Sequence, residues 1–552
     1  MKKIFANLLL IAASALMFAS CDNPAKMAEA AEQISIKCTP EVLEAVAGSI
    51  DATIEVTFPG KYFQPKAILE VTPVILYHGG EVAGEPFHYQ GEKVKDNYKV
   101  ISKKEETTVR ENVHFNFVPG MERSEMVLRA KVLCNGKEYE YPADIKVADG
   151  VNTTYMLASF IFEKNGPAVD FAQDNYQSVI NETAEAQILY LINSADVRNS
   201  QLRSEDIKEY QALLASLAED SRRAITGTEI VAYASPEGDV AHNNKLSANR
   251  EKSATKALDK VTKKLEKGAV TSRSIGEDWE GFQELVSNSD IQDKDLILRV
   301  LSMYSDPNVR EREIRNMSQV YKSLADQILP ELRRARFITN IEYTNYTPEE
   351  LTELVNNNID ALDEEALLRA ATLVKDNDAK LAIYEQAVKK FDSDRAHYNA
   401  AVILAKKGDL AAAEKHLAAL DDQDCKNVKN VKGIIALKKG DLEAAGKLFA
   451  EAGNKENAAV VDILNGHYNE AAAKLSDSKR PIAALANILT GDLAKASSIL
   501  ESHNCPLCSY LKAIVAARQG DNENAKTLLE TAEKNECLKT RKANDVEFIK
   551  FL

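Results

Sequence analysis

The element Gly408-Asp409-Leu410-Ala411-Ala412-Ala413 recurs as Gly440-Asp441-Leu442-Glu443-Ala444-Ala445 and as Gly491-Asp492-Leu493-Ala494-Lys495-Ala496. Each copy begins with a glycine that stands between two short amphipathic segments, and Gly466 and Gly520 occupy the same place in two further copies. Copies that keep one register over such a length predict a solenoid of helix hairpins, because each hairpin can bury its apolar face only against its neighbours.

Small and large residues recur at fixed positions in these copies. A small residue stands before each glycine and another follows it, which lets paired helices approach closely, and a large apolar residue then fills the space between hairpins. The small residues before the glycine are Ala401, Gly433, Ala459, Ala484 and Ala513, those after it are Ala413, Ala445, Ala471, Ala496 and Ala525, and the large residues are Leu417, Phe449, Leu475, Leu500 and Leu529. The pattern resembles the tetratricopeptide repeat at shorter intervals. The resemblance implies that residues 348–552 form an α-helical solenoid whose groove binds envelope proteins.

Residues 34–148 show the period-two alternation of β-strands. The run from Ile50 to Phe58 alternates apolar with polar residues, which places one face of a strand on a core. Asn135-Gly136, between two further alternating runs, is the strongest short signal for a hairpin turn. The sequence therefore predicts an N-terminal all-β sandwich of immunoglobulin-like type.

Residues 155–345 alternate between strand and helix patterns and predict an α+β sheet domain. Strand-like runs cover 188–192 and 228–233. Helical spacing covers 204–217, and a helix is expected from about His242 to Leu265.

The stretch Ala232-Tyr233-Ala234-Ser235-Pro236-Glu237-Gly238, followed by Asn243, Leu246-Ser247 and Arg250, resembles the OmpA-like peptidoglycan-associating domain. In that family a strand ends in Gly-[YH]-[TA]-Asp-x-x-Gly, and the next helix carries Asn-x-x-Leu-Ser-x-x-Arg. The resemblance implies that Ser235, Glu237, Gly238, Asn243 and Arg250 are candidate peptidoglycan-binding residues. The family's Asp meets an ammonium group of the stem peptide and its Arg pairs with a carboxylate. Here Ser235 stands in the place of the Asp.

Two interpretations of this departure follow. In the first interpretation, Glu237 or Asp239 supplies the anionic partner for the ammonium group of the stem peptide from another direction, and peptidoglycan binding is kept. In the second, only the fold is kept, and Arg250 makes a structural ion pair. The resemblance also contains an insertion from about Ser274 to Leu332, within which Trp279 is expected to anchor a core.

The N-terminus carries an export signal. Lys2 and Lys3 precede an apolar run that ends at Ala19-Ser20-Cys21. Such a run is typical of a signal peptide, here residues 1–20, because a membrane-spanning helix needs about 20 apolar residues. Small residues before Cys21 resemble the bacterial lipobox, in which the cysteine is acylated and becomes the new N-terminus. Ordinary signal-peptidase cleavage is the alternative.

On this interpretation residues 21–33 form a tether between the lipid and the folded body, and no second transmembrane candidate follows. The lipoprotein signal, the β domain, the OmpA-like motif and the repeats together resemble envelope lipoproteins of the Bacteroidota.

Six further cysteines follow Cys21. Cys38 and Cys134 lie in the β domain and either pair with each other or stay as two buried thiols. Cys505 and Cys508 with His503 have a spacing that suits zinc, a local disulfide or a redox pair. No fourth ligand lies nearby in the sequence, so we expect neither a metal site nor a redox function.

The remaining observations argue against nucleic-acid binding and against common enzyme classes. The net charge of −15 comes from acidic residues spread along 552 residues, without a basic block that would bind nucleic acid. The minimum motifs for serine hydrolysis, phosphoryl transfer and zinc proteolysis are absent from the sequence, so we expect no catalytic residues, no metal and no cofactor.

We therefore predict a non-enzymatic lipoprotein of the outer membrane, mostly periplasmic, with the inner membrane and the cell surface as alternatives. Its OmpA-like domain would bind peptidoglycan or an envelope partner, and its repeats would bind proteins. The alternative function is a pure protein–protein scaffold of an outer-membrane assembly complex, without peptidoglycan binding.

Overall fold

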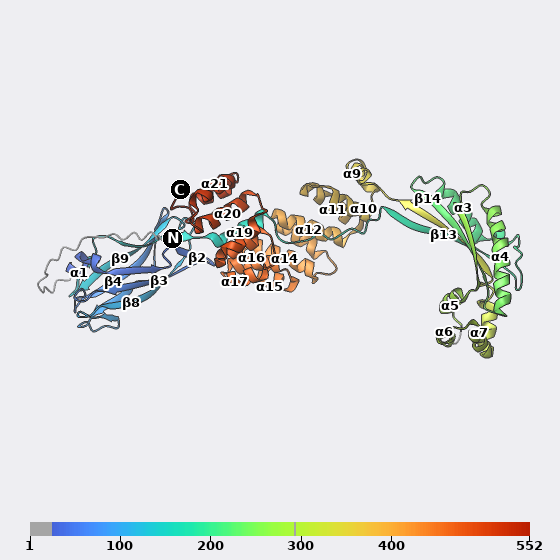
Figure 1. Cartoon of the computed structure of the whole chain (residues 1–552), viewed down its shortest axis with the longest axis horizontal. Coiled ribbons are helices and arrows are strands. Elements are labelled where there is room, and N and C mark those ends of the chain that lie inside the picture. The colour runs from blue at the N-terminus through green and yellow to red at the C-terminus, as the bar shows by residue number, and fades with distance from the viewer. Residues whose placement is uncertain (1–24, 292–293, 552) are drawn as a thin grey trace. The chain divides into compact units, whose positions relative to one another are not determined.

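The structure, a computed structural model, describes residues 25–291 and 294–551 and forms two compact units (Figure 1). The first unit combines the chain up to Ala172 with the chain from Asp394 onward, and the second unit is Gln173–Ser393. The second unit is thus inserted into the sequence of the first. Signal peptide and lipidation at Cys21 fall outside the described residues and stay predictions.

The N-terminal part of the first unit is β-rich, as predicted. Two mainly antiparallel sheets face each other, and the rings of Phe58 and Tyr89 meet between them with centroids 5.3 Å apart. One sheet contains β1 (Ser35–Thr39), β2 (Leu43–Val46), β3 (Ser49–Phe58), β8 (Thr107–Asn116) and β12 (Val151–Asn152). The other contains β4 (Ile68–Tyr77), β5 (Gly80–Ala83), β6 (Phe87–Gly91), β7 (Lys99–Ile101), β9 (Ser124–Cys134), β10 (Lys137–Glu140) and β11 (Ile145–Asp149). The immunoglobulin-like type stays a prediction.

Strand β3 and the hairpin at Asn135-Gly136 both form as their local sequence patterns predict. Every second residue of β3 from Ile50 to Phe58 is buried. The hairpin joins β9 to β10 through Asn135 and Gly136, whose φ angles of 52° and 76° are those a tight two-residue turn requires.

Part of the expected tether is folded onto the β domain. Residues 25–33 form the short helix α1 (Ala25–Glu29) and a 3-10 turn, Ala31–Gln33. Met27 is buried, and its carbonyl accepts a hydrogen bond from the Tyr62 hydroxyl at 2.8 Å. An apolar methionine that can reach a core is enough to dock this segment. The tether expected over residues 21–33 is therefore wrong for residues 25–33, which are folded.

The second unit is an α+β fold around a four-stranded sheet. The strand order is β13 (Val179–Leu189), β16 (Arg334–Thr344), β14 (Arg223–Ala234) and β15 (Ala269–Glu277), and β14 and β15 are parallel while the other pairs are antiparallel. Helices α3 (Glu205–Leu217) and α4 (Val240–Val261) cover one face, where their apolar side chains share a core with Ile188, Ile230 and Phe337. Ser204 caps α3 through its hydroxyl, as its place before the helical pattern predicts.

Two expected boundaries in this region differ from the structure. The strand expected over 188–192 begins earlier and ends at Leu189, and Leu191 and Ile192 are exposed in the loop beyond it. An apolar run alone does not show where strand pairing stops. Residues 155–172, expected in this domain, belong to the first unit, because α2 (Leu157–Lys164) buries its apolar face against α16 and α18.

The insertion between β15 and β16 is a small helical layer with its own apolar core. It contains α5 (Trp279–Ser287), α6 (Lys294–Met303), α7 (Pro307–Asn316) and α8 (Ser318–Gln327). Trp279 packs at the edge of this core, with its ring 5.6 Å from that of Phe282, and its indole N–H donates to Glu277. It is therefore an anchor of the insertion, as expected.

The chain is helical from Pro348 onward, which confirms a β-rich region followed by helices. The second unit contains α9 (Pro348–Asn357), α10 (Glu364–Leu373) and α11 (Asn377–Phe391), so the single helical domain expected over 348–552 is divided between the units. The first unit contains α12 (Asp394–Lys407), α13 (Leu410–Ala418), α14 (Lys426–Lys438), α15 (Leu442–Ala452), α16 (Lys455–Leu464), α17 (Tyr468–Lys474), α18 (Pro481–Thr490), α19 (Leu493–Leu500), α20 (Pro506–Arg518), α21 (Asn522–Ala532) and α22 (Glu536–Lys542).

The recurring Gly-Asp pair is the turn of each hairpin. Gly408 and Gly440 follow a first helix with φ of 91° and 83°, a left-handed conformation that favours glycine. Asp409 and Asp441 then accept the N–H of the residue three positions later and cap the second helix. The predicted small residues lie buried where paired helices meet; a Cβ on Gly433 would lie 2.7 Å from the ring of Phe449.

Among the helices of residues 25–291 and 294–551, none has the length and apolar character that crossing a membrane requires.

Candidate functional site

The structure brings together the residues that the OmpA-like motif singled out. Strand β14 ends at Ala234 and α4 begins at Val240, so that Ser235, Glu237 and Gly238 lie in the connecting loop. Asn243 and Arg250 lie on α4. The loop and the first turns of the helix form one cluster, which is named the Ser235 loop below.

Arg250 lies inside this cluster, where only 1% of its surface is exposed. Its guanidinium donates to the main-chain carbonyls of Ser194 at 3.0 Å, Tyr233 at 2.9 Å and Leu191 at 3.2 Å. Burial lowers the pKa of Arg250 to about 10, which still leaves it charged at neutral pH. Its donors bind carbonyls, whereas the second interpretation had expected an ion pair.

Side chains from the insertion and from the residue just before β16 contact the Ser235 loop. The Ser235 hydroxyl donates to Glu237 at 2.8 Å, and Glu237 forms an ion pair with Arg333 at 2.9 Å. The Gly238 N–H donates to the carboxylate of Glu311 on α7, which also pairs with Arg315. Ser235, Glu237 and Gly238 therefore already have partners within the chain.

Asn243 and Asp239 have partners as well. The Asn243 amide donates to the Glu237 carbonyl at 3.1 Å and to the Glu277 carboxylate at 3.0 Å, and it is buried. Asp239 is the N-cap of α4 and accepts the N–H of His242. The cluster is therefore a closed hydrogen-bond network that positions the helix.

A second candidate site is the groove of the repeat helices in the first unit. Residues 165–172, the extended segment that follows α2, lie along α12, α14 and α16, and this segment is named the strap below. The groove that the sequence predicted for partner proteins thus holds a piece of the same chain.

Asparagine side chains hold the strap by its main chain. Asn399 on α12 accepts the Ala172 N–H at 2.7 Å and donates to the Ala172 carbonyl at 3.1 Å. Asn457 on α16 does the same for Ala168, with both distances 2.9 Å. The Ala168 carbonyl also accepts from Asn430 at 2.9 Å and from Asn454 at 2.8 Å.

Other groove residues bind carbonyls of the strap. Arg480 donates to Gly166 at 2.7 Å, and the Tyr398 hydroxyl donates to Asp170 at 3.0 Å. The Lys406 ammonium lies 5.2 Å from the ring centroid of Phe171.

These asparagines were not among the predicted site residues, although they leave a signal in the sequence. Asn399, Asn430 and Asn457 stand in the first helix of three successive hairpins, nine, ten and nine residues before the turn glycines at 408, 440 and 466. Asparagine is disfavoured inside helices because its side chain competes for main-chain hydrogen bonds. Its recurrence at nearly the same position of three successive hairpins therefore indicates a shared role outside the helix.

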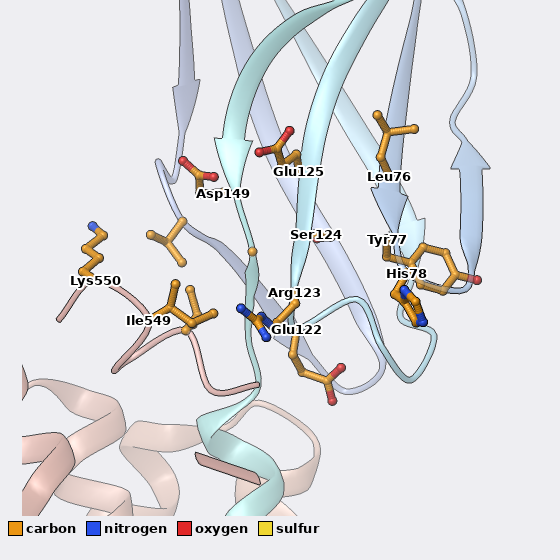
Figure 2. Close-up of a pocket in the computed structure, with 13 residues that line it drawn as sticks. Leu76, Tyr77, His78, Glu122, Arg123, Ser124, Glu125, Asp149, Ile549 and Lys550 are labelled. Atoms are coloured by element: carbon orange, nitrogen blue, oxygen red, sulfur yellow. The ribbon is translucent and has the colours of Figure 1, made fainter. Parts of the chain in front are cut away.

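A cavity of about 560 Å³ lies where the β-sandwich meets the C-terminal residues, within the first unit. Figure 2 shows Leu76 and Tyr77 on one side of it and Ile549 and Lys550 on the other. Two of its acidic side chains, Glu125 and Asp149, both pair with Lys146, at 2.7 Å and 2.5 Å. These two carboxylates therefore already have a partner, and we assign the cavity no role.

Of the six cysteines after Cys21, two form a disulfide and the other four are free thiols. Cys505 and Cys508 form a disulfide at the start of α20, and His503 lies against the Lys479 carbonyl. Cys38 and Cys134 are buried and unpaired with each other, and burial raises the pKa of the Cys38 thiol to about 11. Within residues 25–291 and 294–551, His, Cys, Asp and Glu side chains nowhere gather in threes suited to a metal ion.

Comparisons with known proteins add little to this geometry. No protein-family model matches the chain, and no curated protein matches it. The chain is similar to a tetratricopeptide repeat protein from Parabacteroides merdae, with 14% identity, a TM-score of 0.29 and coverage of 42% of this chain and 97% of the other. It is also similar to Escherichia coli α-2-macroglobulin, solved from domain MG7 to the C-terminus, with 11% identity, a TM-score of 0.13 and coverage of 91% and 62%. The first is compatible with the helical repeats, and neither is close enough to assign a function.

Proposed function

We propose that this chain is a non-enzymatic scaffold protein of the bacterial cell envelope, anchored by a lipid on Cys21 in the outer membrane and facing the periplasm. Its repeat helices would hold extended segments of protein. The observation that carries the proposal is the binding of a main chain in the groove by Asn399 and Asn457, each of which contacts both the N–H and the carbonyl of one residue.

This mode of binding suits a scaffold. An amide side chain has a donor and an acceptor side by side, so it can match both main-chain groups of a residue in extended conformation. Main-chain contacts supply affinity with little dependence on sequence, while side-chain positions between them supply selectivity. Each such hydrogen bond contributes about 0.5–1.5 kcal/mol net, so several in a row are needed for a stable complex.

A site-specific cross-linker tests this part of the proposal. A photoreactive residue in place of Asn427, which is exposed in the first turn of α14 and borders the groove, should give adducts of discrete mass in intact cells. The matched control is Asn522, exposed in the first turn of α21. Equal adducts at both positions, or none at Asn427, would contradict binding in the groove.

Metabolic labelling with a fatty acid tests the anchor. The wild type should incorporate the label, and Cys21→Ala should not. Recovery of unlabelled wild-type protein from the cytosol would contradict the envelope location.

Peptidoglycan binding through the OmpA-like motif is the second candidate function. Its support is that Ser235, Gly238, Asn243 and Arg250 meet in one cluster, in the order strand, loop and helix that the resemblance implies. Against it stand the burial of Arg250, of which 1% is exposed, and the engagement of its guanidinium with three carbonyls.

Co-sedimentation with purified peptidoglycan separates the two functions. The scaffold proposal expects the wild-type chain to stay in the supernatant. Retention of the wild type in the pellet would favour wall binding. Retention of Glu311→Ala alone would mean that the site works only when the carboxylate on Gly238 is removed.

A further inference from the structure

The strap and the helix before it are attached to the repeats in different ways. Helix α2 buries Leu157, Ala158, Ile161 and Phe162, whose exposures are all 4% or less. In the strap only Pro167 is buried, while Asp170 is exposed and the residues around it are half-buried. Apolar burial fixes α2, whereas hydrogen bonds from groove side chains hold the strap.

This difference decides which segment can leave. Local opening starts where few apolar contacts are lost, and hydrogen bonds to water replace those given up by a half-exposed segment. The strap can therefore detach while α2 stays in place.

The contacts define what the groove accepts. Ala168 and Ala172 lie four residues apart, and each has its N–H and its carbonyl bound by one asparagine. Small side chains at these two positions let the main chain approach the helices. The carbonyls of Gly166 and Asp170 are bound by single donors.

Room remains beside the strap for a different occupant. A cavity of about 560 Å³ borders Pro167, Val169 and Asp170 and is lined on the other side by Lys426, Asn427 and Arg480, among others. A segment with longer or acidic side chains between its two small residues would fit this space.

We propose that the strap is a tethered ligand of the groove, and that an extended segment of another protein with small residues four positions apart replaces it on Asn399 and Asn457. This inference rests on the proposed function and adds the chemistry of the partner and a competition within the chain. A short tether gives the strap an effective concentration on the order of millimolar, so a free peptide binds the intact chain far more weakly than its contacts allow.

The probe is a synthetic, fluorescent peptide with the sequence of residues 163–174, and the readout is its anisotropy. In the test variant, residues 166–172 of the full chain are replaced by a Gly/Ser segment of equal length, which leaves α2 unchanged. We expect this variant to bind the peptide at least about 100-fold more tightly than the wild type does. A folded variant that fails to bind the peptide would overturn the proposal.

Two substitutions in the replaced-strap variant separate site-specific binding from adsorption. Asn457→Ala removes both contacts to Ala168 and should weaken peptide binding by about tenfold or more. Asn487→Ala is the matched control, because Asn487 is a buried asparagine of the next first helix whose amide donates to Ala483 in its own helix. Equal losses in both variants would contradict the proposed site.

Hydrogen exchange on the wild-type chain tests whether the strap opens locally, even if the replaced-strap variant does not fold. Amides of residues 168–172 should exchange at least about 100-fold faster than those in the middle of α14, because the strap opens locally. Equal rates would mean that the strap leaves only when the unit unfolds, and the proposal would fail. If the peptide binds but Asn427 cross-links to nothing in cells, the proposed function fails while the tethered ligand stands.

Discussion

The Ser235 loop and the repeat groove both hold groups from elsewhere in the chain, but in different environments. In the loop, Arg250 is almost fully buried, and its three carbonyl partners belong to the same sheet domain. In the groove, Asn399 and Asn457 hold a half-exposed main chain that begins just after a helix.

The difference bears on which of the two sites can bind a ligand reversibly. A buried charge that loses its partners costs several kcal/mol, so Arg250 needs its three carbonyl partners whether or not it meets a ligand. Asn399 and Asn457 are buried beneath the strap, but they carry no charge, and water can replace the hydrogen bonds of the half-exposed strap when it leaves. The groove is thus the better place for reversible binding, although the loop has the more recognisable sequence.

The largest effect is expected from Arg250→Ala. Three carbonyls lose their donor inside the second unit, which should lower its free energy of unfolding by about 3–5 kcal/mol. The measurement is urea unfolding followed by hydrogen exchange in residues 179–344, since the two units need not unfold together.

Arg273→Ala is the control for this substitution. Its side chain is 56% exposed and pairs with Glu229 on the neighbouring strand, so its loss should change stability by less than about 1 kcal/mol. Similar changes in the free energy of unfolding for the two variants would show that Arg250 does not stabilise the fold. Arg250 would then again be a candidate ligand-binding residue.

The next effect concerns the rigidity of the groove. In Gly433→Ala the new Cβ would lie 2.7 Å from the Phe449 ring, so α14 and α15 must separate, which should cost about 1–3 kcal/mol in the first unit. Gly446→Ala on α15 is the control, because its Cβ would lie 3.4 Å from Val461 and alanine favours the helix by about 1 kcal/mol. Thermal unfolding should shift in opposite directions. A shift in the same direction would argue against close packing at Gly433, which lies about one helical turn after Asn430 in α14.

The sequence predicted those parts of the fold that depend on short-range pattern. The period of two in β3, the Asn135-Gly136 turn and the Gly-Asp hairpins follow from neighbouring residues alone, and the structure confirms them. The register of the repeats also placed Gly433 and Phe449 at positions expected to pack between helices, and both are buried. Their contact with each other within one hairpin was not predicted.

Contacts between distant parts of the sequence could not be predicted in this way. Ala168 meets Asn457 across 289 residues, and Gly238 meets Glu311 across 73. No local pattern indicates that a linker fills a groove or that an inserted helix supplies a carboxylate. The structure brings the candidate residues of the motif together, but several of their partners lie in segments that no motif connects.

The smallest effect is expected from Glu311→Ala, and it addresses the Ser235 loop directly. The substitution leaves the Gly238 N–H to water and removes the ion pair with Arg315, which should cost about 1 kcal/mol of stability in the second unit. Faster exchange of the Gly238 amide is the direct readout. Glu313→Ala on the same helix, whose carboxylate pairs with the adjacent Arg312, should leave that amide unchanged. Unchanged exchange in both variants would mean that Glu311 does not cover Gly238 in solution. The loop would then be as open as the groove without its strap, and the contrast between the two sites would rest on Arg250 alone.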